Sequence, residues 1–110
     1  MSNHSALIAA ALAARLNAHV PYSHFLVGAA IETADGRVFT GCNIESASFG
    51  LTICAERTAL FKAISEGARN FIRIAVAADS PQLTPPCGAC RQALRDHCDE
   101  LEIILCNPRG

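Results

Sequence analysis

The sequence predicts an α/β fold, a three-layer αβα sandwich in which helices cover both faces of a mixed β-sheet. Helix-like and strand-like segments alternate along the chain, and no repeat or linker interrupts them. The strand-like segments are rich in β-branched and small apolar residues. Because 110 residues are enough to bury one core, we expect residues 1–110 to form a single domain.

The first element is a helix expected over residues 5–18. Ser5 is its expected N-cap, and apolar residues recur at helical spacing on one face. The members of that face are Leu7, Ile8, Ala11, Leu12 and Leu16. The Val20-Pro21 pair ends the helix, because proline cannot continue it.

A β-hairpin follows the first helix. Strands are expected over 25–32 and 38–41, with residues 34–37 as the turn. This turn contains an Asp-Gly pair, which is typical of hairpins.

The second half of the chain continues the alternation. A helix over 54–66 is expected to end at Gly67, and residues 71–78 alternate apolar side chains as a strand. The proline-rich segment after that strand predicts a loop. A helix over 87–98 and a short strand over 101–106 complete the order.

The charge of the chain limits the classes of partner. Its formal net charge is −1 and its pI is about 6.4, which argues against a dedicated nucleic-acid binder. The apolar stretch 5–14 has no Lys or Arg before it, so we expect no signal peptide. No uncharged run reaches about 20 residues without Pro, Asn or His intervening, so we expect no membrane span. We expect a cytoplasmic protein. Three of its basic side chains are expected to form a solvated face; these are Lys62, Arg69 and Arg73.

Six cysteines allow two kinds of chemistry. Without a secretory signal, a disulfide framework is less favoured than metal or redox chemistry at the Cys-x-x-Cys pair formed by Cys87 and Cys90. Cys42 and Cys106 flank or end strands and are expected to be small buried hydrophobes. The histidines lack ligand spacing relative to the cysteines and are expected on the surface or in loops; they are His4, His19, His24 and His97.

Three of the cysteines stand at the starts of two expected helices. Cys54, Cys87 and Cys90 can supply three of the four tetrahedral ligands of one zinc ion per chain. Helix N-termini stabilise thiolates, and Arg57 and Arg91, each beside a cysteine, can offset the excess negative charge. An open fourth position suits a water molecule that zinc would activate.

Glu56 lies two residues after Cys54, where a carboxylate can act as a proton carrier for such a water. Alone, it could be no more than a first-turn acid favoured by the helix dipole. The Cys-x-Glu motif of Cys54 and Glu56 is followed, after an intervening strand, by the motif Pro86-Cys87-Gly88-Ala89-Cys90. The two motifs together match the signature of zinc-dependent deaminases, which favours a catalytic role for Glu56.

Nearly the whole chain resembles the small homotetrameric cytidine deaminases. In pyrimidine salvage these enzymes convert cytidine to uridine, or deoxycytidine to deoxyuridine, and release ammonia. The matching segments are Pro21-Tyr22-Ser23, Phe25, Val27-Gly28-Ala29-Ala30, Gly41-Cys42-Asn43-Ile44-Glu45, Cys54-Ala55-Glu56-Arg57 and Pro86-Cys87-Gly88-Ala89-Cys90-Arg91-Gln92. The resemblance implies a zinc ion on Cys54, Cys87 and Cys90, with Glu56 as proton shuttle.

The resemblance also implies a nucleoside site. Asn43 and Glu45 would bind the ribose hydroxyls, Phe25 would pack on the pyrimidine, and Ala55 would belong to the substrate-binding residues. Amide and carboxylate groups suit vicinal hydroxyls, although ordinary loop chemistry would also explain both. Phe25 shares a strand face with Val27 and its alternate neighbours, so core packing is an alternative for its ring.

One departure and three alternatives stay open. The family's chain continues past residues 107–110 with a further strand and helix, so the resemblance implies that this C-terminal layer is missing and that the strand over 101–106 is an edge. The alternatives are a related aminohydrolase such as a blasticidin-type deaminase, a non-catalytic zinc-binding module, and a thiol redox protein.

Overall fold

The computed structural model describes residues 4–21, 25–45, 54–78 and 101–106. Their elements are α1 (His4–Ala14), the 3-10 helix η1 (Arg15–Asn17), β1 (Val27–Thr33), β2 (Val38–Cys42), α2 (Ala55–Ser65), β3 (Phe71–Ala78) and β4 (Glu102–Cys106). The expected helix over 87–98 lies outside the described residues.

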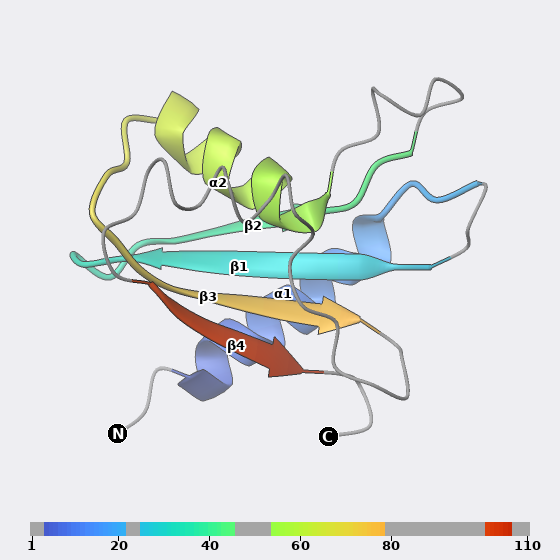
Figure 1. Ribbon diagram of the computed structural model, residues 1–110, viewed down its shortest axis with the longest axis horizontal. Coiled ribbons are helices and arrows are strands. Elements are labelled where there is room, and N and C mark those ends of the chain that lie inside the picture. Colours follow the sequence, from blue (N-terminus) through green and yellow to red (C-terminus); the bar gives the residue numbers. More distant parts are fainter. Residues whose placement is uncertain (1–3, 22–24, 46–53, 79–100, 107–110) are drawn as a thin grey trace.

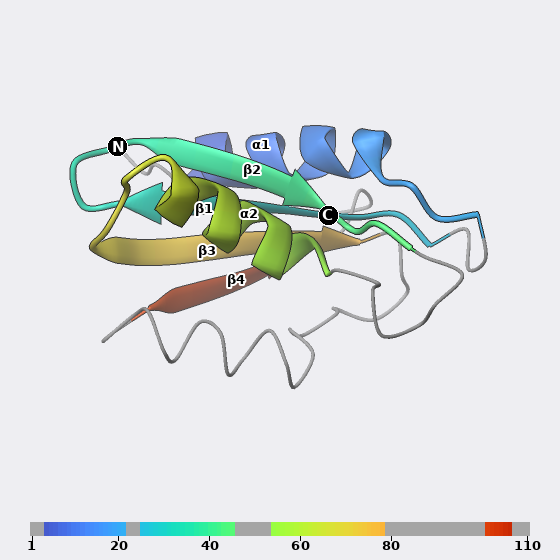
Figure 2. The same ribbon diagram turned by 90° about the horizontal axis from the view of Figure 1, so that it is seen from above.

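The four strands form one mixed sheet in the order β2-β1-β3-β4. β1 is antiparallel to both β2 and β3, whereas β3 and β4 are parallel. Helices α1 and α2 lie on opposite faces of this sheet (Figures 1 and 2). The three-layer α/β architecture with a mixed sheet is therefore confirmed. No helix in the described part of the chain is long and apolar enough to cross a membrane.

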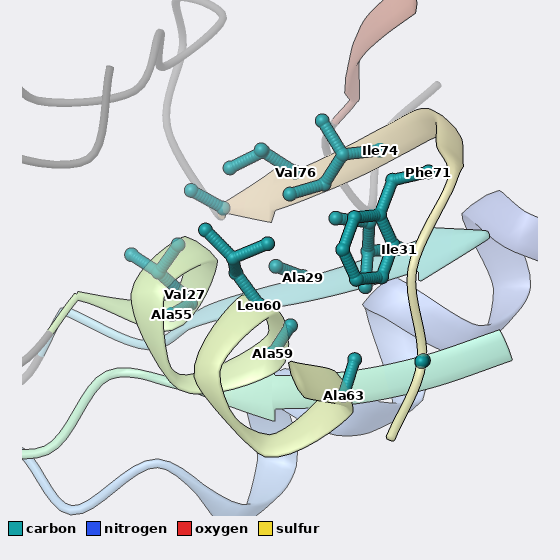
Figure 3. Packing of buried hydrophobic residues seen from close by; sticks show 12 residues of the cluster. Val27, Ala29, Ile31, Ala55, Ala59, Leu60, Ala63, Phe71, Ile74 and Val76 are labelled. Atoms are coloured by element: carbon teal, nitrogen blue, oxygen red, sulfur yellow. The ribbon is translucent and has the colours of Figure 1, made fainter. Parts of the chain in front are cut away.

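Two apolar clusters hold the layers together. On one face, α1 packs against small side chains of the central strands; the buried members are Leu7, Ala11, Ala30, Ala75 and Ala77. On the other face, α2 turns Leu60 and three alanines towards β1 and β3, as Figure 3 shows. Because those alanines are short, α2 lies close to the sheet.

Glycines end α2 and turn the hairpin. Gly67 follows α2 with φ of 90°, and its N–H donates to Ile64 O at 2.9 Å while the N–H of Ala68 donates to Ala63 O at 2.9 Å. This pair of bonds is the Schellman motif, which requires a left-handed residue and so favours glycine. Gly36 has φ of 93° in the expected turn between β1 and β2.

The predictions for the first helix need two corrections. Helix α1 begins at His4, so Ser5 lies inside the helix and is not its N-cap. Leu16 is 67% exposed, because the chain tightens into η1 at Arg15 and a 3-10 helix does not keep the α-helical face. Leu7 and Ala11 are buried as expected.

Arg73 was expected on a solvated face, and that prediction is wrong. Its Nη1 atom lies 2.8 Å from Oε1 of Glu32, which is only 5% exposed, and its Nε atom lies 3.3 Å from Oε1 of Glu102. The three residues are opposite one another on β1, β3 and β4. Arg73 therefore links three strands and compensates a buried carboxylate.

Replacing Arg73 with methionine is expected to lower Tm by about 5–10 °C, because it leaves Glu32 buried without its cation. Arg37→Met is the matched control, since Arg37 pairs with Asp35 at 3.2 Å on the exposed hairpin turn. We expect that variant to change Tm by less than about 3 °C. Thermal unfolding at fixed protein and zinc concentrations compares the two; equal shifts would contradict the structural role of Arg73.

Candidate active site

Those residues predicted to bind substrate or metal that the structure describes lie at one end of the sheet. β1 begins at Val27, opposite Ala78 at the end of β3, and Gly28 is opposite Cys42 at the end of β2. Helix α2 begins at this same end, on the right in Figure 1. The described residues thereby bring Phe25, Asn43, Glu45, Cys54 and Glu56 to one end of the sheet.

Asn43 fastens the segment after β2 to the start of β1. Its side-chain Oδ1 accepts a hydrogen bond from Val27 N at 3.0 Å, and its Nδ2 donates to Phe25 O at 2.9 Å. Its backbone N–H donates to Val27 O at 3.1 Å. Because an amide nitrogen carries two hydrogens, this arrangement still leaves one Nδ2 hydrogen for another acceptor.

The backbone of His19 holds the same segment from its other side. The N–H of His19 donates to Asn43 O at 3.1 Å, and the N–H of Glu45 donates to His19 O at 2.8 Å. His19 was expected on the surface or in a loop, and its part here comes from backbone groups alone. No side-chain pattern in the sequence indicates such a contact.

Asn43→Asp separates this structural role from substrate binding. Aspartate keeps the acceptor for Val27 N but turns a second acceptor towards Phe25 O, so we expect the free energy of unfolding to fall by about 1–2 kcal/mol without any ligand. Asn17→Asp, at an exposed position in η1, is the matched control with a change below about 0.5 kcal/mol. Urea unfolding measures the stability of both variants. An unchanged stability for Asn43→Asp would refute the structural role of the hydrogen bonds that Asn43 makes with Phe25 and Val27.

Phe25 does not belong to either core cluster. It precedes β1 and is 36% exposed, whereas Val27, Ala29 and Ile31 on the strand itself are buried in the core on the α2 side. Among the described residues, the phenyl ring is therefore not part of the core. An exposed aromatic ring beside polar groups offers a flat apolar surface to a ligand.

Cys54 is the N-cap residue of α2. Its backbone is extended, with φ of −73° and ψ of 155°, and its side chain makes no capping hydrogen bond. The carbonyl group of Cys54 accepts two hydrogen bonds from the first turn of the helix. Both the N–H and Oγ1 of Thr58 donate to Cys54 O, at 3.0 and 3.1 Å. The thiol thus lies at the helix N-terminus without capping the helix.

Two charged residues follow Cys54 in the first turn of α2. Glu56 is 4% exposed, an unusual environment for a carboxylate on a helix surface. Nη2 of Arg57 lies 3.8 Å from Sγ of Cys54, a contact that favours the thiolate form of the cysteine. Ala55, between Cys54 and Glu56, has its side chain fully buried in the core.

The remaining described cysteines differ from Cys54 in their surroundings. Cys42 and Cys106 are half-buried on strands, and burial raises the pKa of each thiol above its ordinary value. A raised pKa disfavours the thiolate that binds metal.

Of the three predicted zinc ligands, Cys54 belongs to the described residues. Cys87, Cys90 and Arg91 lie outside the described residues, within which no group of three His, Cys, Asp or Glu side chains could hold a metal ion. Cys54 fits such a site in its position at a helix N-terminus and in its contact with Arg57.

The three-layer α/β fold collects these polar side chains at one end of its sheet, in loops and at element ends where functional residues of such folds often lie. Residues 1–105 match the family model for the cytidine and deoxycytidylate deaminase zinc-binding region. The chain therefore belongs to this deaminase family.

Comparison with individual proteins agrees with this assignment. Cytidine deaminase from Halalkalibacterium halodurans is 55% identical over 105 residues, which cover 94% of this chain and 80% of that protein. The crystal structure of cytidine deaminase from Burkholderia pseudomallei has a TM-score of 0.92 and 52% identity, covering 100% of this chain and 88% of that one. Blasticidin-S deaminase from Bacillus cereus is less similar, with 32% identity over 88 residues, covering 72% of this chain and 62% of that protein.

Proposed function

We propose that this chain hydrolyses cytidine and deoxycytidine to uridine and deoxyuridine with release of ammonia, using one zinc ion held by Cys54, Cys87 and Cys90. The observation that carries the proposal is the first turn of α2. There, the N-cap cysteine is followed two residues later by a buried glutamate, at the end of the sheet that also presents Asn43 and Glu45. Membership of the deaminase family indicates the class of reaction, and the roles of these residues are assigned for that reaction.

Cys54, Cys87 and Cys90 would hold the zinc ion, which would supply Lewis-acid activation of water at neutral pH. Glu56 accepts a proton as water adds to C4 of the cytosine ring, and passes that proton to ring N3. It then takes the remaining proton from the hydroxyl now on C4 and carries it to the exocyclic amine, so that the C4–N bond breaks, the C4 carbonyl forms and ammonia leaves. Arg57, and with it Arg91, offsets the negative charge of the thiolates; the 3.8 Å contact of Arg57 with Cys54 supports its part.

The substrate groups are assigned from the chemistry of each side chain. The second Nδ2 hydrogen of Asn43 and the carboxylate of Glu45 bind the sugar hydroxyls. The exposed ring of Phe25 packs on the pyrimidine. Because the side chain of Ala55 is buried, its contribution is its backbone N–H, which has no intrahelical acceptor in the first turn of a helix.

The resemblance to the small cytidine deaminases extends the proposal to a cytoplasmic homotetramer that acts in pyrimidine salvage. Light scattering of the purified protein coupled to size-exclusion chromatography tests the tetramer. A monomer of about 11.6 kDa would oppose it.

The substrate range is expected to be limited to nucleosides. Nine basic residues against ten acidic ones give little attraction for a phosphate backbone, and the charge of Glu45 repels a phosphate placed nearby. We therefore expect cytidine and deoxycytidine to have kcat/KM at least about 100-fold above that of the 5′-monophosphate or a cytosine-containing oligonucleotide, a difference of about 3 kcal/mol.

Ammonia release from each substrate at low and moderate salt measures this difference. Blasticidin S is included as a competing substrate, because a blasticidin-type deaminase is the main alternative. Efficient and salt-sensitive turnover of the oligonucleotide, or a preference for blasticidin S, would overturn the nucleoside assignment.

A further inference from the structure

Gly41, on β2, is in closer contact with helix α2 than any side chain would allow. A β-carbon at this position would lie 2.4 Å from the backbone N of Ala59 and 2.7 Å from the backbone O of Ala55. Both distances are shorter than carbon makes with nitrogen or oxygen without displacing one of them. The backbone of α2 therefore rests directly on the backbone of β2 at Gly41.

The sequence on both sides of this contact keeps the helix close to the sheet. Ala55, Ala59 and Ala63 recur every four residues along the side of α2 that faces the sheet, and all three are fully buried (Figure 3). Ala29, which is opposite Gly41 on β1, is also fully buried. Small residues thus line the contact from both layers.

This contact joins the two parts of the proposed site. The first turn of α2 carries Cys54 and Glu56, and Ala55 O lies within that turn. Gly41 is two residues before Asn43 on the same chain segment. The separation between the metal-binding helix and the sugar-binding segment is therefore set where α2 meets Gly41.

We infer that Gly41 is a positioning residue for the deamination: its lack of a side chain fixes the height of the first turn of α2 above the sheet. This inference rests on the proposed function. Any side chain at Gly41 lifts Cys54 and Glu56 relative to Asn43, because backbone atoms at the contact cannot rotate away. A displacement of about 1 Å between catalytic and binding groups lowers turnover by about 100-fold.

The test compares Gly41→Ala with Gly28→Ala. Gly28, on β1, makes the equivalent contact with α1, where a β-carbon would lie 2.1 Å from Ala11 O and 2.5 Å from Arg15 N. Both variants overpack a helix on the sheet and should lose stability, but α1 carries none of the proposed site residues. Purified, zinc-loaded protein is assayed for cytidine turnover, zinc affinity by chelator competition, and thermal unfolding.

Gly41→Ala is expected to lower kcat by about 100-fold and zinc affinity by at least about tenfold, with a smaller change in KM. Gly28→Ala is expected to keep kcat/KM and zinc affinity within about threefold of the wild type while losing at least as much thermal stability. Similar kinetics in the two variants, whether both normal or both impaired, would overturn the inference.

If Gly41→Ala does not fold, Ala59→Val and Ala63→Val take its place. Both enlarge the contact of α2 with the sheet from the helix side, the first over Gly41 and the second one turn further from Cys54. A loss of turnover and zinc affinity in Ala59→Val alone supports the inference, and any other pattern overturns it. An inactive wild type would overturn the proposed function itself and this inference with it, whereas an active wild type with an unimpaired Gly41→Ala would overturn the inference alone.

Discussion

Glu56→Gln is expected to lower kcat for cytidine by about 10²–10⁴-fold while leaving the fold and the bound zinc in place. Glutamine has nearly the same size and shape as glutamate, so the buried position in the first turn of α2 accommodates it. The amide cannot take a proton from water and return it to the base. The effect should therefore appear in kcat, while KM stays within a few-fold of the wild-type value.

Steady-state kinetics together with zinc content and thermal unfolding distinguish this loss from a structural one. Glu66→Gln is the matched control, because Glu66 is exposed at the opposite end of the same helix. That variant should retain wild-type kinetics. Near wild-type turnover in Glu56→Gln would mean that another group moves the proton, and the proposed mechanism would be wrong.

The helix that carries Glu56 was predictable because local and long-range signals agree there. Residues 54–66 were expected and Ala55–Ser65 is observed, with Gly67 after the helix in the left-handed conformation that its position requires. Strand β3 was predicted over 71–78 and is observed as Phe71–Ala78, since its alternating β-branched residues fit a strand buried on both faces. The order of the described elements and the mixed sheet were predicted for the same reason.

The features that the sequence did not predict depend on partners distant along the chain. The pairing of Arg73 with Glu32 joins residues 41 positions apart, and charge alone suggested an exposed arginine. The role of His19 comes from its backbone, whose groups are the same in every residue except proline. The contact at Gly41 was not predicted, because a glycine in a strand can mark a bulge, a bend or the close approach of another backbone, and the sequence does not say which.

The sequence motifs predicted which of the described residues would lie together, but not how the structure holds them there. The sequence motifs singled out Cys54, Glu56, Asn43 and Glu45, and the described residues bring them to one end of the sheet. Nothing in the motifs indicated that Asn43 is also a structural clamp on Phe25 and Val27. Substitutions of Asn43 are therefore expected to affect stability as well as substrate binding.

Cys54→Ala and Cys54→Ser are both expected to lose the zinc ion and at least about 10⁴-fold in kcat/KM. Neither a methyl group nor a neutral hydroxyl replaces a thiolate ligand, and two remaining thiolates do not hold the ion tightly. Without zinc, water is not activated and Glu56 has no acidified water from which to accept a proton. Zinc content by atomic absorption and cytidine turnover measure the two losses.

The same pair of variants separates the loss of metal from damage to α2. Cys54 is the N-cap, and serine is among the best N-cap residues while alanine is among the poorest, so metal-depleted Cys54→Ser should be about 1 kcal/mol more stable than metal-depleted Cys54→Ala. Equal inactivity despite this difference in stability would attribute the loss of activity to the loss of the metal.

Cys42→Ala and Cys106→Ala are the controls and should retain one zinc per chain, because burial raises the pKa of both thiols and disfavours metal binding. Cys54→Ser with wild-type zinc affinity would remove Cys54 from the ligand set and, with it, the proposed site at the start of α2.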